Sequence, residues 1–196
     1  MSILIPFAQL APSPWKNGGG STTEIAIEPA GATLHNFDWR LSLAAISHGG
    51  PFSHFPGIDR SLALLDGPGL TLDIGSNRQV LLEGEDSAIS FPGEADVLAT
   101  LHDAPTLDLN VMTRREVCQH KLGRRRIDGS ARFAPGGQKS ILFLAAGESL
   151  TVSSEDERIG LVRFDAVVFE PGKLWLLEGD DATVFIIDIY QRPASP

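Results

Sequence analysis

The stretch GPGLTL, residues 67–72, decides the fold, because the chain contains a second version of it. GESLTV, residues 147–152, follows at an offset of 80 and again has a glycine turn before an alternating run. A D-x5-P-G corner at residues 86–93, beginning with Asp86, returns at residues 165–172 at an offset of 79. Two matches in the same order at nearly constant offset indicate that one unit of structure occurs twice.

A third match and the strand pattern extend this indication to the whole chain. TLDLNVMTR, residues 106–114, corresponds to TVFIIDIYQR, residues 183–192, which is one residue longer. Apolar and polar residues alternate in DWRLSLAAI (38–46) and LTLDI (70–74), as expected of strands with two different faces. Clusters such as HGGP, DGPG and EPGK separate the runs, and no long amphipathic helix stands out. We therefore predict an all-β fold, a bicupin with two double-stranded β-helix (jelly-roll) modules in one chain.

The predicted domain boundaries follow from the repeat. We expect an N-terminal cupin-like module at residues 1–115, a basic connector at 116–139, and a C-terminal module at 140–196 that is completed by strands from elsewhere in the chain. RREVCQHKLGRRR, residues 114–126, carries six bases and one acid, which leaves about −14 on the rest of the chain. It is either a phosphate or partner site or a solvated connector. We prefer the connector, because blocks of like charge usually stay in water.

Composition narrows the classes of function. The 196 residues can bury one sizeable core or two small ones, and the net charge of −9 argues against nucleic acid as a partner. The N-terminus lacks a basic region and is broken by prolines, so we expect no signal peptide. No apolar run approaches the ~20 residues of a membrane helix. We expect a cytoplasmic protein with no membrane partner, and a homodimer is left open.

Metal and nucleophilic chemistry find little support in the sequence. A metal-binding cupin resembles H-x-H with a later Glu and His, but no two of the five histidines have that spacing. There is no G-x-S-x-G elbow, and the one cysteine, Cys118, is expected to be a small buried residue. We predict no metal site, no cofactor and no catalytic residue of these kinds.

The segment WKNGGGSTTE, residues 15–24, is the first candidate for a binding site. Its order fits neither the P-loop nor the dinucleotide fingerprint. Three glycines allow a ligand to approach the backbone closely, and Trp15 can wall an apolar cavity. Lys16 and Asn17 supply donors, whereas Thr22 and Glu24 share one face of the strand that follows. The alternative is a glycine turn before a strand, with Trp15 in the core.

Two further segments supply candidate polar and aromatic groups. Arg40 and Ser42 lie opposite the apolar row of their strand, so Arg40 either faces solvent or is a buried cation that needs a carboxylate or a ligand. GPFSHFPGIDR, residues 50–60, offers two phenylalanines and an Asp-Arg pair, which could form a pocket lid or a hydrophobic plug with a surface salt bridge.

Together these segments resemble the HutD/Ves family. Its pattern reads approximately W-[KR]-N-[GA]-[GA]-G-x-T-x-E-I, then W-R-x-S-x-A, then G-x-F-S-x-F-P-G-x-[DE]-R, then D-x-N-x-M-T-R. The resemblance is strong over residues 15–118 and weak beyond them. The positions that it selects as ligand-binding are Trp15, Lys16, Asn17, Gly20, Thr22, Glu24, Arg40, Ser42, Phe52, Phe55, Asp59, Arg60 and Asn110.

The resemblance implies a bicupin without metal histidines and an accessory or regulatory role in histidine utilisation. From it we expect a protein that binds a small carboxylate intermediate, such as urocanate or N-formylglutamate, in a cavity of the first module. Arg40, with Lys16 or Arg60, would hold the carboxylate. Two alternatives are a metal-independent hydrolase or isomerase with Glu24 or Asp59 as base, and a scaffold that binds a protein through the basic cluster at 114–126.

Overall fold

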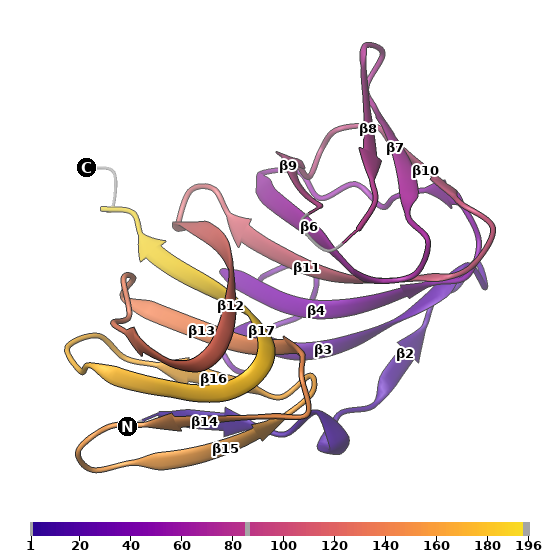
Figure 1. Ribbon diagram of the computed structural model, residues 1–196. Helices are drawn as coiled ribbons and strands as arrows, with labels where there is room; N and C mark the ends of the chain where they lie inside the picture. Colours follow the sequence, from indigo (N-terminus) through magenta and orange to yellow (C-terminus); the bar gives the residue numbers. More distant parts are fainter. Residues whose placement is uncertain (1, 85–86, 194–196) are drawn as a thin grey trace. The chain divides into compact units, whose positions relative to one another are not determined.

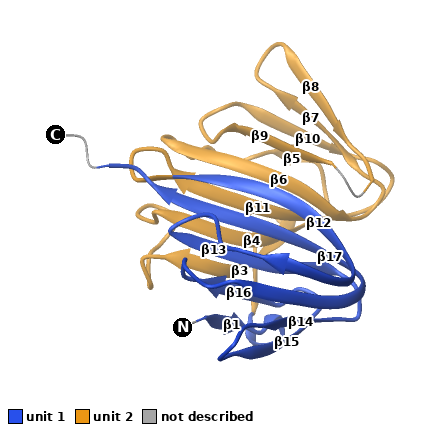
Figure 2. Ribbon diagram, turned by 60° about the vertical axis from the view of Figure 1, so that its left-hand side comes forward, with its two compact units in different colours: residues 1–10, 119–196 blue, residues 11–118 orange. Residues whose placement is uncertain are grey.

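The computed structural model describes residues 2–84 and 87–193, and it is built almost entirely of strands (Figure 1). Two compact units divide the chain: unit 2 comprises residues 11–118, and unit 1 comprises residues 1–10 and 119–196 (Figure 2). The strands of unit 2 are β2 (Pro12–Pro14), β3 (Gly20–Glu28), β4 (Trp39–Ile46), β5 (Gly50–Pro51), β6 (Ile58–Asp66), β7 (Leu70–Ile74), β8 (Arg78–Leu82), β9 (Ala88–Pro92), β10 (Val97–Leu101) and β11 (Thr106–Arg114).

Unit 1 contains one short helix and the remaining strands. These are β1 (Ile3–Ile5), the 3₁₀ helix η1 (Phe7–Gln9), β12 (Cys118–Phe133), β13 (Lys139–Ala146), β14 (Ser149–Ser153), β15 (Arg158–Val162), β16 (Ala166–Phe169) and β17 (Trp175–Gln191). They form one seven-stranded sheet in the order β1-β16-β13-β17-β14-β15, with β12 paired to β17. No helix among the described residues is long and apolar enough to cross a membrane.

Unit 2 contains two antiparallel sheets. The larger has the order β2-β3-β4-β11-β6-β9, and the smaller has the order β5-β10-β7-β8. Residues directly opposite each other in an antiparallel pair point to the same side of the sheet, so the register defines the faces. The face of the larger sheet that carries Ala44, Leu62 and Leu64 packs against the smaller sheet through Leu70 and Leu72. We call it the inner face.

Both faces of the larger sheet are buried at its centre. β4 has buried residues at all but one position, including Leu41 and Leu43 on the face opposite the inner one. A second small cluster, Phe37, Ile58 and Met112, lies at one end of the inner face. The alternation in residues 38–46 therefore does not separate core from solvent, and polar residues of the inner face are enclosed.

Unit 1 has one large hydrophobic cluster. Its buried members include Leu142, Leu144, Val152, Phe169 and Trp175. Phe169 packs on Trp175 with ring centroids 4.7 Å apart. Unit 1 also buries the polar residues Ser140, Asp165 and Thr183, and the Asp165 carboxylate accepts hydrogen bonds from the amides of Phe7 and Val162.

The sequence repeat coincides with a repeated order of strand pairing. In unit 2, β6 pairs with β9 and β11, and β7 pairs with β8 and β10. In unit 1, β13 pairs with β16 and β17, and β14 pairs with β15 and β17. Gly67 and Gly147, which open the repeated stretch, both have a φ of 103°. Asp86, part of the second match, lies outside the described residues.

The segment expected to be a basic connector at residues 116–139 has regular structure. Most of it is the 16-residue strand β12, which pairs with β17. Residues 1–10, placed with the N-terminal module by the sequence, belong to unit 1, because β1 pairs with β16. The repeat begins at residue 67, so it contains no information on where the first ten residues pair.

Candidate functional site

Most of the predicted polar residues lie on the inner face of unit 2. Arg40 and Arg60 are each directly opposite Met112, and Arg60 is also opposite Phe91. The next row contains Glu24, Ser42, Asn110 and Leu62, and the row after it contains Thr22, Ala44, Asp108 and Leu64. Residues from four strands, β3, β4, β6 and β11, thus come to one surface (Figure 1).

Arg60 is a buried cation without an acidic partner. It is 6% exposed, and no carboxylate among the described residues pairs with it. Its guanidinium carbon lies 5.3, 5.5 and 5.0 Å from the ring centroids of Phe52, Phe55 and Phe91. Nη1 donates to the carbonyl of Ser53 at 3.4 Å, whereas Nε has no partner among residues 2–84 and 87–193. Burial, with the charge of Arg40, lowers the pKa of Arg60 to about 10.

Three aromatic rings offset part of the cost of burying this charge, because each ring face attracts a cation. They do not supply a hydrogen-bond acceptor for Nε, and a buried charge normally has a charged or hydrogen-bonded partner. An anion within hydrogen-bonding distance of Nε would provide both the opposite charge and the hydrogen-bond acceptor.

Arg40 is also buried, but it has an acidic neighbour. It is 9% exposed, its Nε donates to Glu24 at 2.8 Å, and its Nη1 donates to Ser42 at 3.3 Å. The Glu24 side chain is 44% exposed, so this ion pair lies where the inner face meets solvent. The structure thus selects the buried alternative for Arg40, with Glu24 as the carboxylate.

β11 lies between β4, which carries Arg40, and β6, which carries Arg60, and it adds polar side chains to the inner face. Asp108 is fully buried, and Asn110 is 8% exposed. Thr106 donates to Asp108 Oδ2 at 3.3 Å, but Asp108 Oδ1 and Asn110 Oδ1 have no partner in the described part of the chain. Burial raises the pKa of Asp108 from 3.8 to about 7, and the hydrogen bond from Thr106 opposes this change.

The glycine-rich segment forms a turn whose shape depends on close packing. Trp15 Nε1 donates to Thr22 Oγ1 at 2.7 Å, and Asn17 Oδ1 accepts from the Gly19 amide at 3.0 Å. A Cβ at Gly20 would lie 2.3 Å from the Ala45 carbonyl oxygen. Asn17 and Gly20 therefore have local structural roles, and Lys16 is exposed. Trp15 packs at the edge of the unit 2 core.

Asp59 lies apart from the other predicted residues. It is opposite Thr113 rather than Met112, so it faces the other side of the sheet from Arg60. Arg115 Nε donates to Asp59 at 2.8 Å, and the same guanidinium makes two bonds to Glu94. Arg115 lowers the pKa of Glu94 by this hydrogen bonding. Asp59, expected from the sequence among the ligand-binding positions, therefore lies on the other face from Arg60, because neighbours in a strand point to opposite faces.

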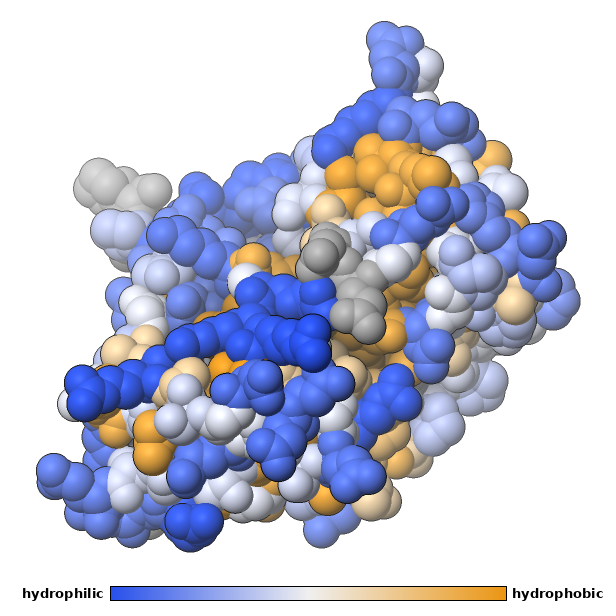
Figure 3. All heavy atoms as spheres, viewed as in Figure 1, coloured by the Kyte–Doolittle hydropathy of each residue, from blue (hydrophilic) through white to orange (hydrophobic). Residues whose placement is uncertain are grey.

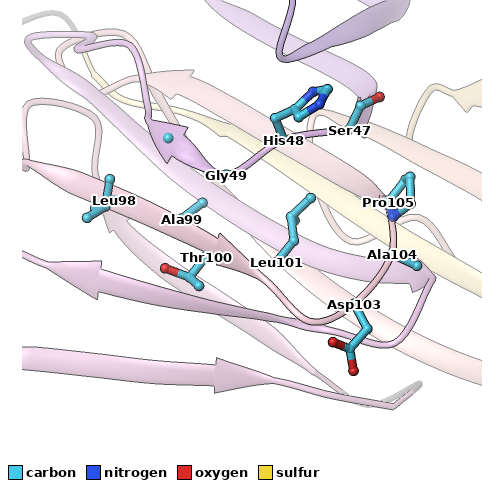
Figure 4. Close-up of a pocket in the computed structure, with 11 residues that line it drawn as sticks. Ser47, His48, Gly49, Leu98, Ala99, Thr100, Leu101, Asp103, Ala104 and Pro105 are labelled. Atoms are coloured by element: carbon cyan, nitrogen blue, oxygen red, sulfur yellow. The ribbon is translucent and has the colours of Figure 1, made fainter.

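The structure also contains an open hollow of about 670 Å³ in unit 2. Its lining residues, Ser47–Gly50, Leu98–Leu101 and 103–105, include none of the predicted ligand-binding positions. In Figure 4, Ser47 and His48 lie on one side of it and the residues of β10 on the other. The hollow thus adds no group to the inner-face site.

The arginines of the basic cluster are engaged locally. Arg114 donates to the carbonyls of Phe37 and His35, and Arg126 pairs with Asp181 at 2.6 Å. Arg125 donates to the carbonyl of Arg132. Figure 3 shows hydrophilic side chains over the part of the surface that carries β12. These contacts agree with a solvated strand of regular structure.

Sequence reasoning missed two participants in the site, Asp108 and Phe91. The alternation that placed Asn110 and Asp108 on the same face of residues 107–112 was visible, so Asp108 could have been selected with Asn110. Phe91 had no comparable signal, because its position beside Arg60 depends on the pairing of β9 with β6. Among the described residues no three His, Cys, Asp or Glu side chains gather as a metal site would require.

Comparison with known proteins identifies the family. The chain matches HutD over residues 8–186. The chain belongs to the HutD family. The resemblance seen in the sequence is thereby confirmed, and the match extends well beyond residue 118.

Curated relatives support the assignment. Protein Ves of Citrobacter koseri is 34% identical over 134 residues, which are 68% of this chain and 67% of the relative. An uncharacterized 21.2 kDa protein in the hutC 3′ region of Pseudomonas putida is 34% identical over 151 residues, covering 76% and 77%. The HutD family is thus linked to the histidine-utilisation locus.

Solved structures share the fold of this chain. A conserved protein of unknown function from Pseudomonas aeruginosa PAO1 superposes with a TM-score of 0.89 at 28% identity, covering 97% of this chain and 99% of the other. HutD from Pseudomonas fluorescens SBW25 gives 0.83 at 28% identity, covering 98% and 100%. Bacillus subtilis oxalate decarboxylase, at 10% identity and a TM-score of 0.63, shows the cupin-like fold alone.

Proposed function

We propose that the inner face of unit 2 binds a small carboxylate, and that this HutD family member acts as an accessory or regulatory protein of histidine utilisation by binding it. The observation that carries the proposal is Arg60, a buried guanidinium with three aromatic neighbours. Among the residues that the structure describes, its Nε has no hydrogen-bond partner and no carboxylate pairs with it. A ligand carboxylate would accept a charge-assisted hydrogen bond from Nε and neutralise the charge.

The surroundings of Arg60 suit a small anion. Arg40 lies in the same row across β11, and its single acidic partner, Glu24, is partly exposed. With Asp108 uncharged below about pH 7, the two arginines and Glu24 leave one net positive charge on the face. Phe52 and Phe55 can exclude water from the ion pair, which strengthens it. Urocanate and N-formylglutamate, the ligands expected from the family, are both carboxylates.

Thermal unfolding in the presence of ligand tests the proposal. A ligand at 100 times its dissociation constant stabilises the folded protein by roughly 2.7 kcal/mol, which raises Tm measurably. We expect urocanate or N-formyl-L-glutamate to raise Tm, and the corresponding methyl esters, which lack the carboxylate charge, to have little effect. Equal shifts with acids and esters, or no shift with either acid at millimolar concentration, would refute carboxylate binding.

An acid–base enzyme of the same pathway is the second candidate, and Asp108 is the observation that favours it. A carboxyl group with a pKa near 7 on a ligand-facing surface is suited to proton transfer at neutral pH. Asp108 replaces Glu24 and Asp59 as the candidate base, because those two carboxylates are held by Arg40 and Arg115. Turnover of urocanate or N-formylglutamate by wild-type protein, and its loss in Asp108→Asn, would support this function.

Two other expectations are retained as proposals. The repeated pairing order supports a bicupin, and the buried arginines of unit 2 support that unit as the binding module. The scaffold hypothesis for residues 114–126 has no specific observation in its favour, because Arg114, Arg115, Arg125 and Arg126 are engaged within the chain.

A further inference from the structure

The inner face has two buried acceptors without donors. Among the described residues, the buried side-chain atoms that lack a hydrogen-bond partner are Arg60 Nε, Asp108 Oδ1, Asn110 Oδ1 and Trp175 Nε1. The first three lie on one face of one sheet, and Trp175 lies in the apolar core of unit 1. Folded proteins rarely leave such groups unpaired, so their gathering on one surface needs a physical reason.

The two acceptors are ordered along β11. Asn110 is one row from Arg60 and Asp108 is two rows away, which corresponds to roughly 7 and 14 Å along the strand. Asp108 is no counter-ion for Arg60, since burial and Thr106 are what set its pKa. The face therefore presents a cationic donor at one end and acceptors toward the other.

Resting on the proposed carboxylate site, we infer that the ligand carries an N–H donor as well as its carboxylate. The carboxylate lies at Arg60, and the N–H reaches Asn110 Oδ1, the acceptor one row away. The ligand class is thus a small acid with an amide or heteroaromatic N–H. An acid without the donor would leave Asn110 Oδ1 unpaired, and a site built to bond an N–H rejects analogues that lack it.

Matched ligand pairs test this inference on the wild-type protein. Urocanate is compared with trans-3-(2-furyl)acrylate, in which an oxygen heterocycle replaces the imidazole and the N–H is absent. N-formyl-L-glutamate is compared with N-formyl-N-methyl-L-glutamate. Calorimetric titration is run at about pH 6, where Asp108 is largely uncharged and the face keeps its net positive charge. We expect the N–H member of at least one pair to bind about tenfold or more tightly than its partner.

The outcomes separate the two proposals. Equal affinity within twofold for both members of each pair that binds would overturn the N–H inference and leave carboxylate binding intact. Failure of all four acids to bind would overturn both.

Variants locate the contact. Asn110→Leu should reduce the preference for the N–H member to about threefold or less. Ser90→Ala, on the opposite face of the same sheet, should retain the preference. A preference that survives in Asn110→Leu would exclude Asn110 as the acceptor and overturn the inference. The comparison of ligands on wild-type protein stands even if a variant fails to fold.

Discussion

Arg40 and Arg60 lie in one row across the large sheet of unit 2, each directly opposite Met112 on β11. Two buried guanidinium groups on one face repel each other, and the charge of Arg40 contributes to the lowered pKa of Arg60. Within residues 2–84 and 87–193, Arg40 has a carboxylate partner, Glu24, and Arg60 has none. This difference in pairing between two neighbouring cations is the basis on which we propose Arg60 as the anion site.

Glu24→Gln tests whether Glu24 belongs to the ligand or to Arg40. Removing the carboxylate should free Arg40 Nε and remove repulsion of a ligand anion, so carboxylate affinity should rise several-fold. Because Glu24 is partly exposed, the unfolding free energy should fall by only about 1 kcal/mol. Calorimetric titration and urea unfolding measure the two effects. Weakened binding would instead show that Glu24 accepts a hydrogen bond from the ligand.

Asp108→Asn tests the raised pKa through stability. A carboxyl whose folded pKa exceeds its unfolded pKa binds more protons in the folded state, so it makes the wild type less stable as pH rises from about 4 to about 7. Asparagine cannot ionise. The variant should therefore gain stability relative to the wild type across this window, by up to about 4 kcal/mol, and the difference should be flat above it. A pH-independent difference between the two urea-unfolding curves would contradict the raised pKa.

Gly20→Ala tests the close packing of the glycine-rich turn. The added Cβ would meet the Ala45 carbonyl oxygen at 2.3 Å, so the backbone must move. We expect a loss of at least about 2 kcal/mol in unfolding free energy. Gly50→Ala is the control, because its Cβ would meet nothing within 4 Å. Similar unfolding free energies for the two variants would mean that the backbone of the turn accommodates the added Cβ at little cost.

Arg115→Ala tests the separation of Asp59 from the binding face. Losing the bonds to Asp59 and Glu94 should lower the unfolding free energy by about 1 kcal/mol or less, since all three groups are partly exposed. Carboxylate affinity should be unchanged, because this network lies on the other side of the sheet from Arg60. A large loss of affinity would show that Asp59 acts on the ligand after all.

The fold was predictable from the sequence as far as strands and repetition go. Alternation and the GPGLTL repeat predicted an all-β chain, and the structure shows strands at both copies, β7 and β14. The positions of β1 and β12, which lie outside the repeated segments, could not be predicted. β1 joins unit 1 through long-range pairing with β16, and β12 is a strand despite its arginines, because its partner is β17.

The site was predictable where side chains alternate along one strand. Thr22 and Glu24, Arg40 and Ser42 were each placed correctly with respect to their own strand, and register then brought them together. Asp59 and Arg60 were both predicted as ligand-binding, but they are neighbours in β6, so their side chains point to opposite faces of the sheet. The aromatic surroundings of Arg60 depend on β9 and on the loop before β6, whose positions no local pattern contains.

The affinity of Arg60→Met for urocanate and N-formyl-L-glutamate, measured by calorimetric titration beside urea unfolding, tests the central claim most directly. Methionine fills the space between Phe52, Phe55 and Phe91 without a charge, so the unliganded protein should change in stability by less than about 1 kcal/mol. Binding should weaken by about 30-fold or more, because the ligand carboxylate loses its cation. Undiminished affinity in a folded Arg60→Met protein would contradict the account.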